Sequence, residues 1–386
     1  MNPIITETIK SICMLSDKKI KFLDLSKAYS ELSFEIDVAL LSSARSGLYL
    51  LGERLRRFEV EYAEFVRAAY CVGIGNGSDA LRLALLGCGV REGDEVIVPS
   101  HTFIATWLAV THIGAIPVPV EPDVGTMNIN VELIDRAITK KTKAILVTHM
   151  YGLPVDLDPL LGLAKRLNLV TIEDAAQAHG SRYKSKRIGS HSDVVCWSFY
   201  PGKNLGAFGD AGAITTNSRV IADRIRSLRN YGSTEKYVYN QTGFNSRLDD
   251  IQAAVLSVKL KYLDEWNARR RGISDIYFKH LSHLPLIMPL RSEGFESAWH
   301  LFVVRTKYRN ALRDFLAREG CESIIHYPIP PHKQKCYSKS FGDYVLPLAE
   351  GIADSVLSLP ISPHHSDSEI TRVCELCGEF FNQKGG

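Results

Sequence analysis

The sequence predicts an α/β protein in which a mainly parallel β-sheet carries helices on both faces and a smaller α+β domain follows toward the C-terminus. Two observations support this prediction. Over the first two-thirds of the 386 residues, short runs rich in Val and Ile alternate with longer amphipathic stretches, and this alternation is typical of a parallel sheet with connecting helices. The chain is also longer than one compact core usually requires, so two domains are expected.

Six apolar segments are predicted to form strands because each is short, rich in Val or Ile, and bounded by Gly, Pro or Asp. They cover residues 94–100, 116–122, 143–152, 169–176, 193–200 and 212–217. Helical periodicity at 78–89 and 156–168 places helices between them. In open α/β sheets ligands bind beyond the carboxyl ends of the strands, so functional residues should directly follow these runs.

The pattern changes in the last third of the chain. A long helical pattern over 246–281 predicts a connection between two domains. Beyond it, a strand pattern at 298–306, a helix at 309–320 and Pro-rich turns at 326–332 predict the smaller α+β domain. We therefore expect an N-terminal extension over 1–21, a large domain over 22–257 and a small domain over 258–386.

Composition excludes several classes of protein. The formal net charge is only +3, from 46 Lys and Arg against 43 Asp and Glu, without a clustered basic stretch, so a nucleic-acid partner is not expected. No apolar run reaches the length of a membrane span, and the start lacks the order of a signal peptide. Eight scattered cysteines favour the reducing cytoplasm.

One Cys-x-x-Cys pair occurs, at Cys374 and Cys377. A zinc site needs a second pair of ligands, and none of suitable spacing follows. The same stretch has the pattern of a helix that begins with a capping box formed by Ser366 and Glu369. We therefore expect no metal in this protein.

A Gly-rich turn follows the apolar residues of "CVGIGNGSDALRLALL" at 71–86 and opens a helix. The N–H groups and dipole of such a helix start can hold a phosphate, with Gly77 and Ser78 nearest. A dinucleotide site is disfavoured because the glycines run G-x-G-x-G, and because the nearby acids Asp94 and Glu95 precede a strand. A purely structural turn remains the alternative for this segment on its own.

A pair of carboxylates ends the strand in "TIEDAAQAHG" at 171–180. Asp174 facing the cleft could pair with a cation such as a protonated ring nitrogen, although one acid of such a pair is often only solvated. Gln177 lies three residues further on and could reach the same ligand if the turn is helical.

Lys203 lies at the end of the next predicted strand, in the Gly- and Ala-rich "SFYPGKNLGAFGDAGAI" at 198–214. It is not a Walker lysine, because Asn204 follows it and no glycine stands five residues before Gly202. Ser198, just ahead, could donate to a phosphate. A phosphate cradle, a carboxylate for a pyridine nitrogen and a closely packed lysine are what pyridoxal phosphate requires.

These segments resemble the DegT/StrS-type nucleotide-sugar aminotransferases, a fold-type-I family that depends on pyridoxal phosphate. The resemblance runs from about residue 22 to residue 364. Its motifs here are "GNGSDAL", "PSHTFIATWLAV", "EDAAQAHG", "SFYPGKNLGAFGDAGA", "GFNSRLDDIQAA" and "HYPIPPH". Together they are highly specific.

The resemblance implies a role for each candidate residue. The implied cofactor-binding residues are Gly77, Ser78, Phe103, Asp174, Gln177, Ser198, Lys203 and Asn245. Lys203 would form the Schiff base and carry protons, Asp174 would pair with the pyridine nitrogen, and Gln177 would contact the 3′-oxygen of the ring. Phe103 would stack on the ring, and Gly77, Ser78 and Ser198 would hold the phosphate. Asn245 would reach that phosphate from the neighbouring subunit, which implies a homodimer with shared active sites.

The form of the lysine motif is similar to that of enzymes that aminate C3 of a dTDP-3-keto-6-deoxyhexose, with Tyr200, His326 and Tyr327 facing the sugar. Phe208 departs from the leucine expected there. Arg247 is the candidate for the carboxylate of the amino donor, expected to be L-glutamate, and a surface salt bridge is its alternative role. During turnover the cofactor would pass through its pyridoxamine phosphate form.

Four other functions are weighed against this one. The nearest is a C4 aminotransferase acting on a nucleotide-linked 4-keto-6-deoxy sugar. Related dehydratases have lost the lysine, which this chain keeps at Lys203. A regulatory or sugar-sensing relative would lack a site residue, and none is missing. A nicotinamide oxidoreductase is disfavoured by the glycine spacing.

Overall fold

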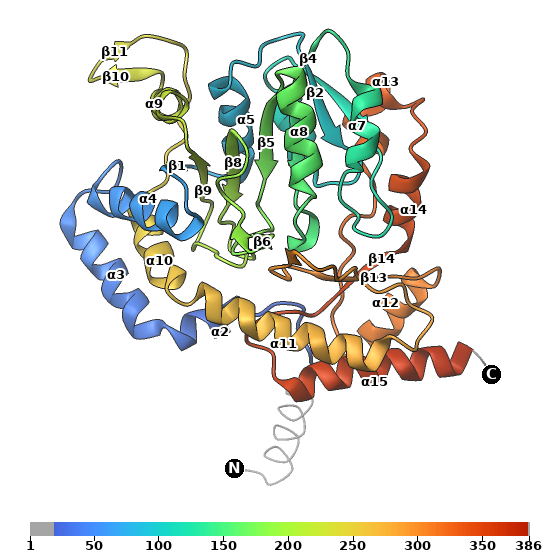
Figure 1. Ribbon diagram of the computed structural model, residues 1–386. Coiled ribbons are helices and arrows are strands. Elements are labelled where there is room, and N and C mark those ends of the chain that lie inside the picture. The colour runs from blue at the N-terminus through green and yellow to red at the C-terminus, as the bar shows by residue number, and fades with distance from the viewer. Residues whose placement is uncertain (1–18, 385–386) are drawn as a thin grey trace.

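A seven-stranded sheet forms the centre of the computed structural model, which describes residues 19–384 (Figure 1). The strand order is β1-β9-β8-β5-β4-β2-β3. These strands are β1 (Tyr70–Ile74), β2 (Glu95–Pro99), β3 (Ile116–Val120), β4 (Thr142–Thr148), β5 (Val170–Asp174), β8 (Val194–Ser198) and β9 (Gly212–Thr216). Only β9 runs antiparallel to its neighbours, β1 and β8. The prediction of a mainly parallel sheet is therefore confirmed.

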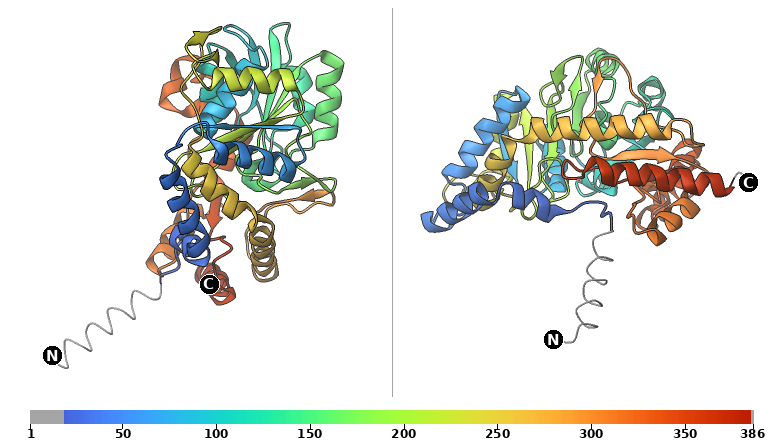
Figure 2. Two further views of the ribbon diagram at one scale, coloured as in Figure 1. Left: turned by 90° about the vertical axis from the view of Figure 1, so that its left-hand side faces the viewer. Right: turned by 90° about the horizontal axis from the view of Figure 1, so that it is seen from below.

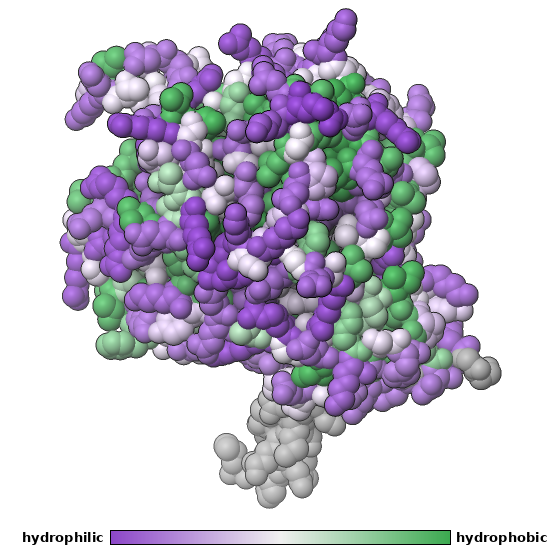
Figure 3. All heavy atoms as spheres, in the orientation of Figure 1, coloured by the Kyte–Doolittle hydropathy of each residue, from purple (hydrophilic) through white to green (hydrophobic). Residues whose placement is uncertain are grey.

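Helices cover both faces of this sheet, as the two further views in Figure 2 show. One face packs against α5 (Gly77–Gly87), α6 (Ile104–Thr111) and α9 (Arg219–Leu228). The other face packs against α4 (Glu53–Val66), α7 (Val131–Ala137), α8 (Leu157–Leu167) and α10 (Asp250–Leu260). The surface seen in Figure 3 is mainly hydrophilic with smaller apolar areas, because the apolar stripes of these helices face the sheet.

The first described helices are α2 (Leu25–Glu31) and α3 (Ser33–Ser46). Ile36 of α3 is buried against Val255 and Val258 of α10. The opposite side of α3 leaves Phe34, Val38 and Leu41 exposed. Most of the extension predicted over 1–21 lies outside the described residues.

The C-terminal third has its own hydrophobic cluster, which includes Phe302, Leu316 and Val373. It is built from α11 (Leu263–Leu281), β13 (Phe302–Arg305), α12 (Arg309–Arg318), β14 (Val356–Leu359) and α15 (Asp367–Lys384). Two further helices lie outside it: α13 (Ser338–Phe341) packs against Trp107 of α6, and Ile352 of α14 (Pro347–Ser355) lies in a smaller cluster with Leu301 and Val303. β13 and β14 pair antiparallel, and α11 and α15 run side by side (Figure 2). Short strands complete the chain: β6 (Arg182–Tyr183), β7 (Lys186–Arg187), β10 (Ser233–Glu235), β11 (Val238–Tyr239) and β12 (Phe295–Glu296).

The helix predicted over 246–281 is two helices, so this prediction was wrong in detail. α10 begins at Asp250, and Lys261 and Tyr262 separate it from α11. The break allows α10 to pack against α3 and α4 while α11 packs against α15, which lies in a different cluster. The predicted domain boundary at 257/258 falls within α10 and stays a prediction.

The C-terminal helix begins as its sequence indicates. The hydroxyl of Ser366 accepts from the backbone N–H of Glu369 (3.2 Å), and the Glu369 carboxylate accepts from the N–H of Ser366 (2.7 Å). Cys374 and Cys377 are buried thiols of this helix. Over residues 19–384 there is no cluster of His, Cys, Asp and Glu that could hold a metal ion, and no helix there is both long and apolar enough to cross a membrane.

Candidate active site

Lys203 lies in a tight loop just beyond the carboxyl end of β8. Its backbone N–H donates to the carbonyl of Tyr200 (2.8 Å), and a side chain at Gly206 would place Cβ 2.3 Å from the carbonyl oxygen of Pro201. Only glycine therefore fits at position 206. Lys203 is half-buried, and its Nζ makes no hydrogen bond or ion pair with any described residue. The amine is therefore available to a ligand.

Burial lowers the pKa of Lys203 to about 8, although the negative charge of Asp174 acts in the opposite direction. A lysine needs its neutral form to act as a nucleophile or base, and this shift makes that form accessible near neutral pH. The environment of Lys203 thus suits covalent or proton-transfer chemistry.

Asp174 is the last residue of β5 and is buried. Its carboxylate accepts from the hydroxyl of Thr106 (3.1 Å) and from the N–H of Ala176 (3.2 Å). Burial raises the pKa of Asp174, while the Ala176 hydrogen bond and the charge of Lys203 partly counter this. A cation bound beside it would favour the ionised carboxylate.

Glu173, the acid next to Asp174 in the sequence, does not face Lys203 with it. Successive residues of a strand point to opposite faces of the sheet. The Glu173 carboxylate accepts from Nε2 of His149 (2.7 Å) and from the N–H of Ser192 (3.0 Å). Of the two strand-end acids, Asp174 therefore remains the candidate for ligand binding.

Gln177 and Tyr327 are linked beside Asp174. The side-chain oxygen of Gln177 accepts from the N–H of Tyr151 (2.6 Å), and its amide nitrogen donates to the hydroxyl of Tyr327 (3.3 Å). The Tyr327 ring lies 5.3 Å from that of Phe103, centroid to centroid. Half of the Phe103 side chain is exposed, so its ring can receive a planar ligand. Phe103, Gln177 and Tyr327 come from distant segments and meet at one place.

The turn between β1 and α5 fits a phosphate. Asn76 caps α5 by accepting from the N–H of Asp79 (2.8 Å), while the N–H groups of Gly77 and Ser78 have no partner among the described residues. A Cβ on Gly77 would lie 2.5 Å from Cβ of Ser198. The absent side chain brings the two backbones together and leaves a cradle with free donors.

His326 lies close enough to Lys203 for the charge of the lysine to affect the pKa of its ring. Its Nδ1 is 2.8 Å from the hydroxyl of Ser358, and its carbonyl accepts from the hydroxyl of Tyr151. Burial, with the charge of Lys203, lowers the pKa of His326 to about 4, so the ring is neutral at pH 7. Tyr200 is 59% exposed and lies at the start of the Lys203 loop.

Asn245 and Arg247 lie on a segment that passes the phosphate cradle. Asn245 is exposed and pairs with Asn230 through a backbone bridge. Arg247 donates to the side-chain oxygen of Asn230 (3.0 Å) and lies over the ring of Tyr231. It forms no ion pair with a described carboxylate, so the alternative of a surface salt bridge is not seen in this part of the chain.

The sequence interpretation missed two residues. Thr106, which donates to Asp174, lies three residues after Phe103 at helical spacing, and that spacing could have identified it. His300 lies near Lys203, whose charge contributes to lowering the pKa of His300, and it contacts the side chain of Asn204. No signal in the sequence links these distant positions.

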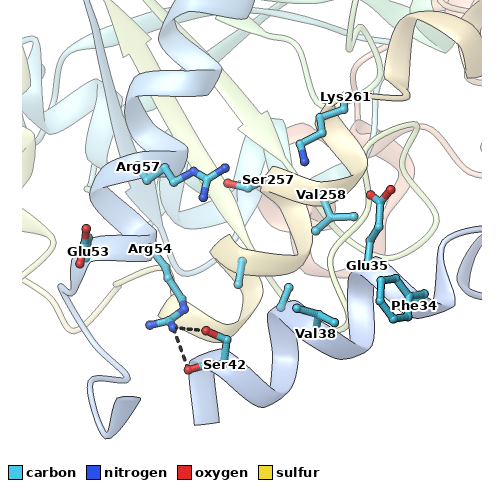
Figure 4. Close-up of a pocket in the computed structure, with 12 residues that line it drawn as sticks. Phe34, Glu35, Val38, Ser42, Glu53, Arg54, Arg57, Ser257, Val258 and Lys261 are labelled. Atoms are coloured by element: carbon cyan, nitrogen blue, oxygen red, sulfur yellow. Dashed lines mark hydrogen bonds between the residues drawn. The ribbon is translucent and has the colours of Figure 1, made fainter. Parts of the chain in front are cut away.

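A cavity of about 530 Å³ lies away from Lys203, between α3, α4 and α10 (Figure 4). In it Arg54 donates to the hydroxyl of Ser42 (2.9 Å), and Arg57 and Lys261 line the wall. None of the predicted site residues lines this cavity. This cavity is therefore separate from the candidate active site.

A model of the DegT/DnrJ/EryC1/StrS aminotransferase family matches residues 31–377 of the chain. The chain belongs to this family. Its expected membership and its expected class, a nucleotide-sugar transaminase, are therefore confirmed.

Two relatives are 48% identical to the chain. One is the dTDP-3-amino-3,4,6-trideoxy-alpha-D-glucose transaminase of Streptomyces venezuelae, aligned over 94% of this chain and 96% of the relative. The other is the dTDP-3-amino-3,6-dideoxy-alpha-D-galactopyranose transaminase of Aneurinibacillus thermoaerophilus, aligned over 94% and 99%. The crystal structure of S. venezuelae DesV in complex with a ketimine intermediate superposes with a TM-score of 0.93, at 47% identity, and the match covers 94% of this chain and 98% of DesV.

The family depends on pyridoxal phosphate. Another solved structure, of NtdA from Bacillus subtilis with bound cofactor PMP, superposes with a TM-score of 0.88 at 30% identity, covering 95% of this chain and 86% of NtdA. The amine of Lys203 and the N–H groups of the β1–α5 turn have no partner within residues 19–384, and with the buried carboxylate of Asp174 they are chemically suited to this cofactor.

Proposed function

We propose that the protein is an aminotransferase that converts a dTDP-3-keto-6-deoxyhexose to the dTDP-3-amino-3,6-dideoxyhexose, with L-glutamate as amino donor. The observation that carries the proposal is the uncommitted amine of Lys203, with its pKa lowered to about 8, beside the buried carboxylate of Asp174. This pair of residues occurs in a chain that is 48% identical to two dTDP-amino-sugar transaminases over more than nine-tenths of its length.

We assign the cofactor to the residues around Lys203. The donors of Gly77, Ser78 and Ser198 would hold the phosphate, and Asp174 would pair with the ring nitrogen. When bound, pyridoxal phosphate supplies an electron sink for cleavage of the Cα–H bond of the donor. Lys203 would accept and return the proton, because burial lowers the pKa of its Nζ to about 8.

Five further residues would orient the ring and the nucleotide sugar. Gln177 is held by the N–H of Tyr151 and would contact the 3′-oxygen, and Phe103 would cover the ring face. For the sugar we propose Tyr200, His326 and Tyr327. In support, the ring of Tyr327 contacts Phe103, and that of His326 lies 5.5 Å from Tyr327.

We propose that the carboxylate of the amino donor binds Arg247. Its guanidinium has no carboxylate partner in the described chain and lies near the segment of the phosphate cradle. A planar guanidinium can hold a carboxylate through two parallel hydrogen bonds. Arg247→Lys should therefore raise the KM for glutamate more than the KM for the sugar.

We further propose a homodimer with shared active sites, in which Asn245 reaches the phosphate bound by the neighbouring subunit. In support, Asn245 is exposed, and apolar residues of α3 and the segment after it face solvent in the single chain, as an interface would require. They are Phe34, Val38, Leu41, Leu48, Tyr49 and Leu50.

Mixing two inactive variants tests the shared sites. Lys203→Ala and Asn245→Ala chains, refolded together, form mixed dimers in which one site receives both Lys203 and Asn245 unchanged. We expect activity above that of either variant alone. If Asn245 acts within its own chain, mixing restores no activity.

The catalytic proposal is tested with the holoenzyme, L-glutamate and a dTDP-3-keto-6-deoxyhexose generated in place. We expect a product one amino group richer, with NMR placing the amine at C3, and 2-oxoglutarate formed in equal amount. Lys203→Ala should lose turnover, while Lys261→Ala, at an exposed lysine, should keep it. Amination at C4 of a 4-keto sugar would support the nearest alternative, and loss of oxygen without amine transfer would support a dehydratase.

A further inference from the structure

A second cavity, of about 290 Å³, lies between the Lys203 loop and the helices α2, α10 and α11. It is lined by residues of the loop over 201–208, by the start of α2, by α10 and α11, and by residues 362–364. Neither Asp174 nor Gln177 nor His326 lines it, although Lys203 does. The cavity is therefore adjacent to the candidate active site without being the pocket that holds its acid and amide groups.

Two buried cations line this cavity. Lys259 of α10 is 5% exposed, and its Nζ donates to the carbonyl of Gly206 (2.7 Å) and lies 4.5 Å from the centre of the Phe208 ring. Arg270 of α11 is 4% exposed. An ammonium carries three donors, and this one makes a single hydrogen bond to the described chain.

Arg270 is only partly satisfied. Its Nη1 donates to the carbonyls of Trp299 (3.2 Å), His300 (3.4 Å) and Ile361 (2.7 Å). Its Nε is buried and has no hydrogen-bond partner among residues 19–384. Carbonyl oxygens carry only partial charge, so they leave the guanidinium without a neutralising partner.

No carboxylate compensates these two charges. Among the described residues that line the cavity, Asp24 is the one acid; it accepts from Nζ of Lys21 (2.8 Å) and caps α2. His364, which also lines it, contacts Glu31 (3.0 Å). Neither Lys259 nor Arg270 forms an ion pair within residues 19–384. Burial alone lowers the pKa of Lys259 to about 8 and that of Arg270 to about 9.

We propose that this cavity binds a small anion, an inorganic oxyanion or a carboxylate, between Lys259 and Arg270. Buried charges are normally paired. An anion here would supply the negative charge that the two cations lack, and it would accept hydrogen bonds from their unused donors. Because Lys259 also holds Gly206, the bound anion would stabilise the loop that carries Lys203. The inference rests on the buried cations and does not depend on the substrate proposed above.

Calorimetric titration of the holoenzyme tests the proposal, because bound cofactor fills the phosphate cradle of the active site. Sodium phosphate and sodium acetate are titrated separately, in a buffer free of other inorganic anions, to distinguish an oxyanion from a carboxylate. We expect one saturable site per chain for at least one of them. Absence of saturable binding of both would overturn the proposal.

Variants locate the site. Lys259→Met removes the charge and should weaken binding about tenfold or more, whereas Lys259→Arg keeps charge and donor and should stay within about threefold of the parent. Lys261→Met, at the exposed lysine just after α10, is the matched control and should bind as the parent does. Equal affinity of Lys259→Met and Lys261→Met would contradict the assignment.

The methionine variant would also lose the bond to Gly206, so a second measurement does not depend on its folding. Crystals of the unaltered holoenzyme soaked in bromide should give an anomalous peak between Nζ of Lys259 and the guanidinium of Arg270. A cavity without that peak would refute the proposal even if phosphate binds elsewhere on the protein.

Discussion

The side-chain oxygen of Asn204 lies 3.1 Å from Nδ1 of His300, and this contact ends a chain of hydrogen bonds that begins on α11. Nδ2 of Asn267 donates to the carbonyl of His179 (2.8 Å), which leaves the Asn267 side-chain oxygen to accept from Nδ2 of Asn204 (2.9 Å). Nδ2 of Asn204 also donates to the carbonyl of Ala298 (2.8 Å). The oxygen of Asn204 is therefore an acceptor, and Nδ1 of His300 carries the proton.

These hydrogen bonds hold the side chain of Asn204, the residue that follows Lys203. Burial lowers the pKa of His300 well below its usual value, and the charge of Lys203 acts in the same direction, so the ring stays neutral. The neutral ring adds no positive charge beside the lysine. The hydrogen-bond chain thus holds the backbone of the Lys203 loop without opposing protonation of the amine.

Replacing His300 should show how much the hydrogen bond from its Nδ1 to Asn204 contributes to stability. His300→Leu leaves the buried oxygen of Asn204 without a donor, which should lower the free energy of unfolding by about 1–3 kcal/mol. His300→Asn places an amide N–H near the position of Nδ1 and should recover most of this loss. Urea unfolding of the cofactor-free protein measures both. Equal losses in the two variants would show that the contact with Asn204 contributes nothing.

The reactivity of Lys203 should depend on pH with a midpoint near 8, because burial lowers its pKa from 10.5 to about 8. Only the neutral amine reacts, so acetylation of the cofactor-free protein, quantified peptide by peptide, follows its titration. Asp174→Asn removes a charge that favours the protonated amine and should move the midpoint further down. Lys259, whose pKa is lowered to about 8 by burial alone, should not respond and serves as the internal control.

The same shift affects stability with a definite sign. Between pH 8 and 10.5 the unfolded chain binds a proton at Lys203 that the folded chain has released. The contribution of Lys203 to the free energy of unfolding should therefore rise with pH across this window. Lys203→Met should abolish that part of the pH dependence in the cofactor-free protein. An unchanged slope would show that the lysine is solvated in the folded state.

Glu173 is expected to support the fold beneath the candidate active site. Burial alone would raise its pKa, but hydrogen bonding to His149 and Ser192 and the charges of His149 and His191 together hold it below the usual value. In Glu173→Gln, an NH₂ group takes the place of one carboxylate oxygen, so one of the donors now bonded to Glu173 loses its acceptor. This should cost about 2 kcal/mol in the free energy of unfolding. Because the folded-state pKa is lowered, the contribution of Glu173 should decline as the pH falls below about 4.5.

Glu265→Gln is the matched control for this variant. Glu265 is exposed on α11, and its one ion pair with a residue of the described chain is with Arg269 at i,i+4 spacing, so its replacement should cost less than about 0.5 kcal/mol. Chemical unfolding at pH 7 compares the two variants. Similar losses would show that the buried pair of Glu173 with His149 is not a significant source of stability.

The sequence predicted what depends on local pattern. The strand before Asp174 and the one before Lys203 each have a short β-branched run and a turn signal, so their ends could be located and the two residues placed at one edge of the sheet. The contact of Asn204 with His300 joins positions 96 residues apart, and no local pattern reports it. Lys259 likewise resembles an ordinary polar position of an amphipathic helix, and only tertiary packing shows that it is buried.

The close approach of Gly77 to Ser198 provides a further test of the phosphate cradle. A Cβ at position 77 would lie 2.5 Å from Cβ of Ser198, nearer than two carbon atoms can pack. Gly77→Ala must therefore push the start of α5 away from β8, at a cost of about 1–3 kcal/mol. The same movement displaces the N–H groups of residues 77 and 78, so the affinity for pyridoxal phosphate should fall as well.

Two further variants distinguish the clash from a general intolerance of alanine. Gly77→Ala combined with Ser198→Gly removes the opposing Cβ and should recover most of the lost free energy of unfolding, but not the affinity for the cofactor, because the Ser198 hydroxyl is gone. Gly162→Ala on α8 meets open space and should raise the free energy of unfolding by about 0.5–1 kcal/mol. Thermal unfolding and fluorescence titration with pyridoxal phosphate measure the two quantities. If Gly77→Ala alone binds the cofactor as tightly as the parent, the β1–α5 turn does not hold the phosphate.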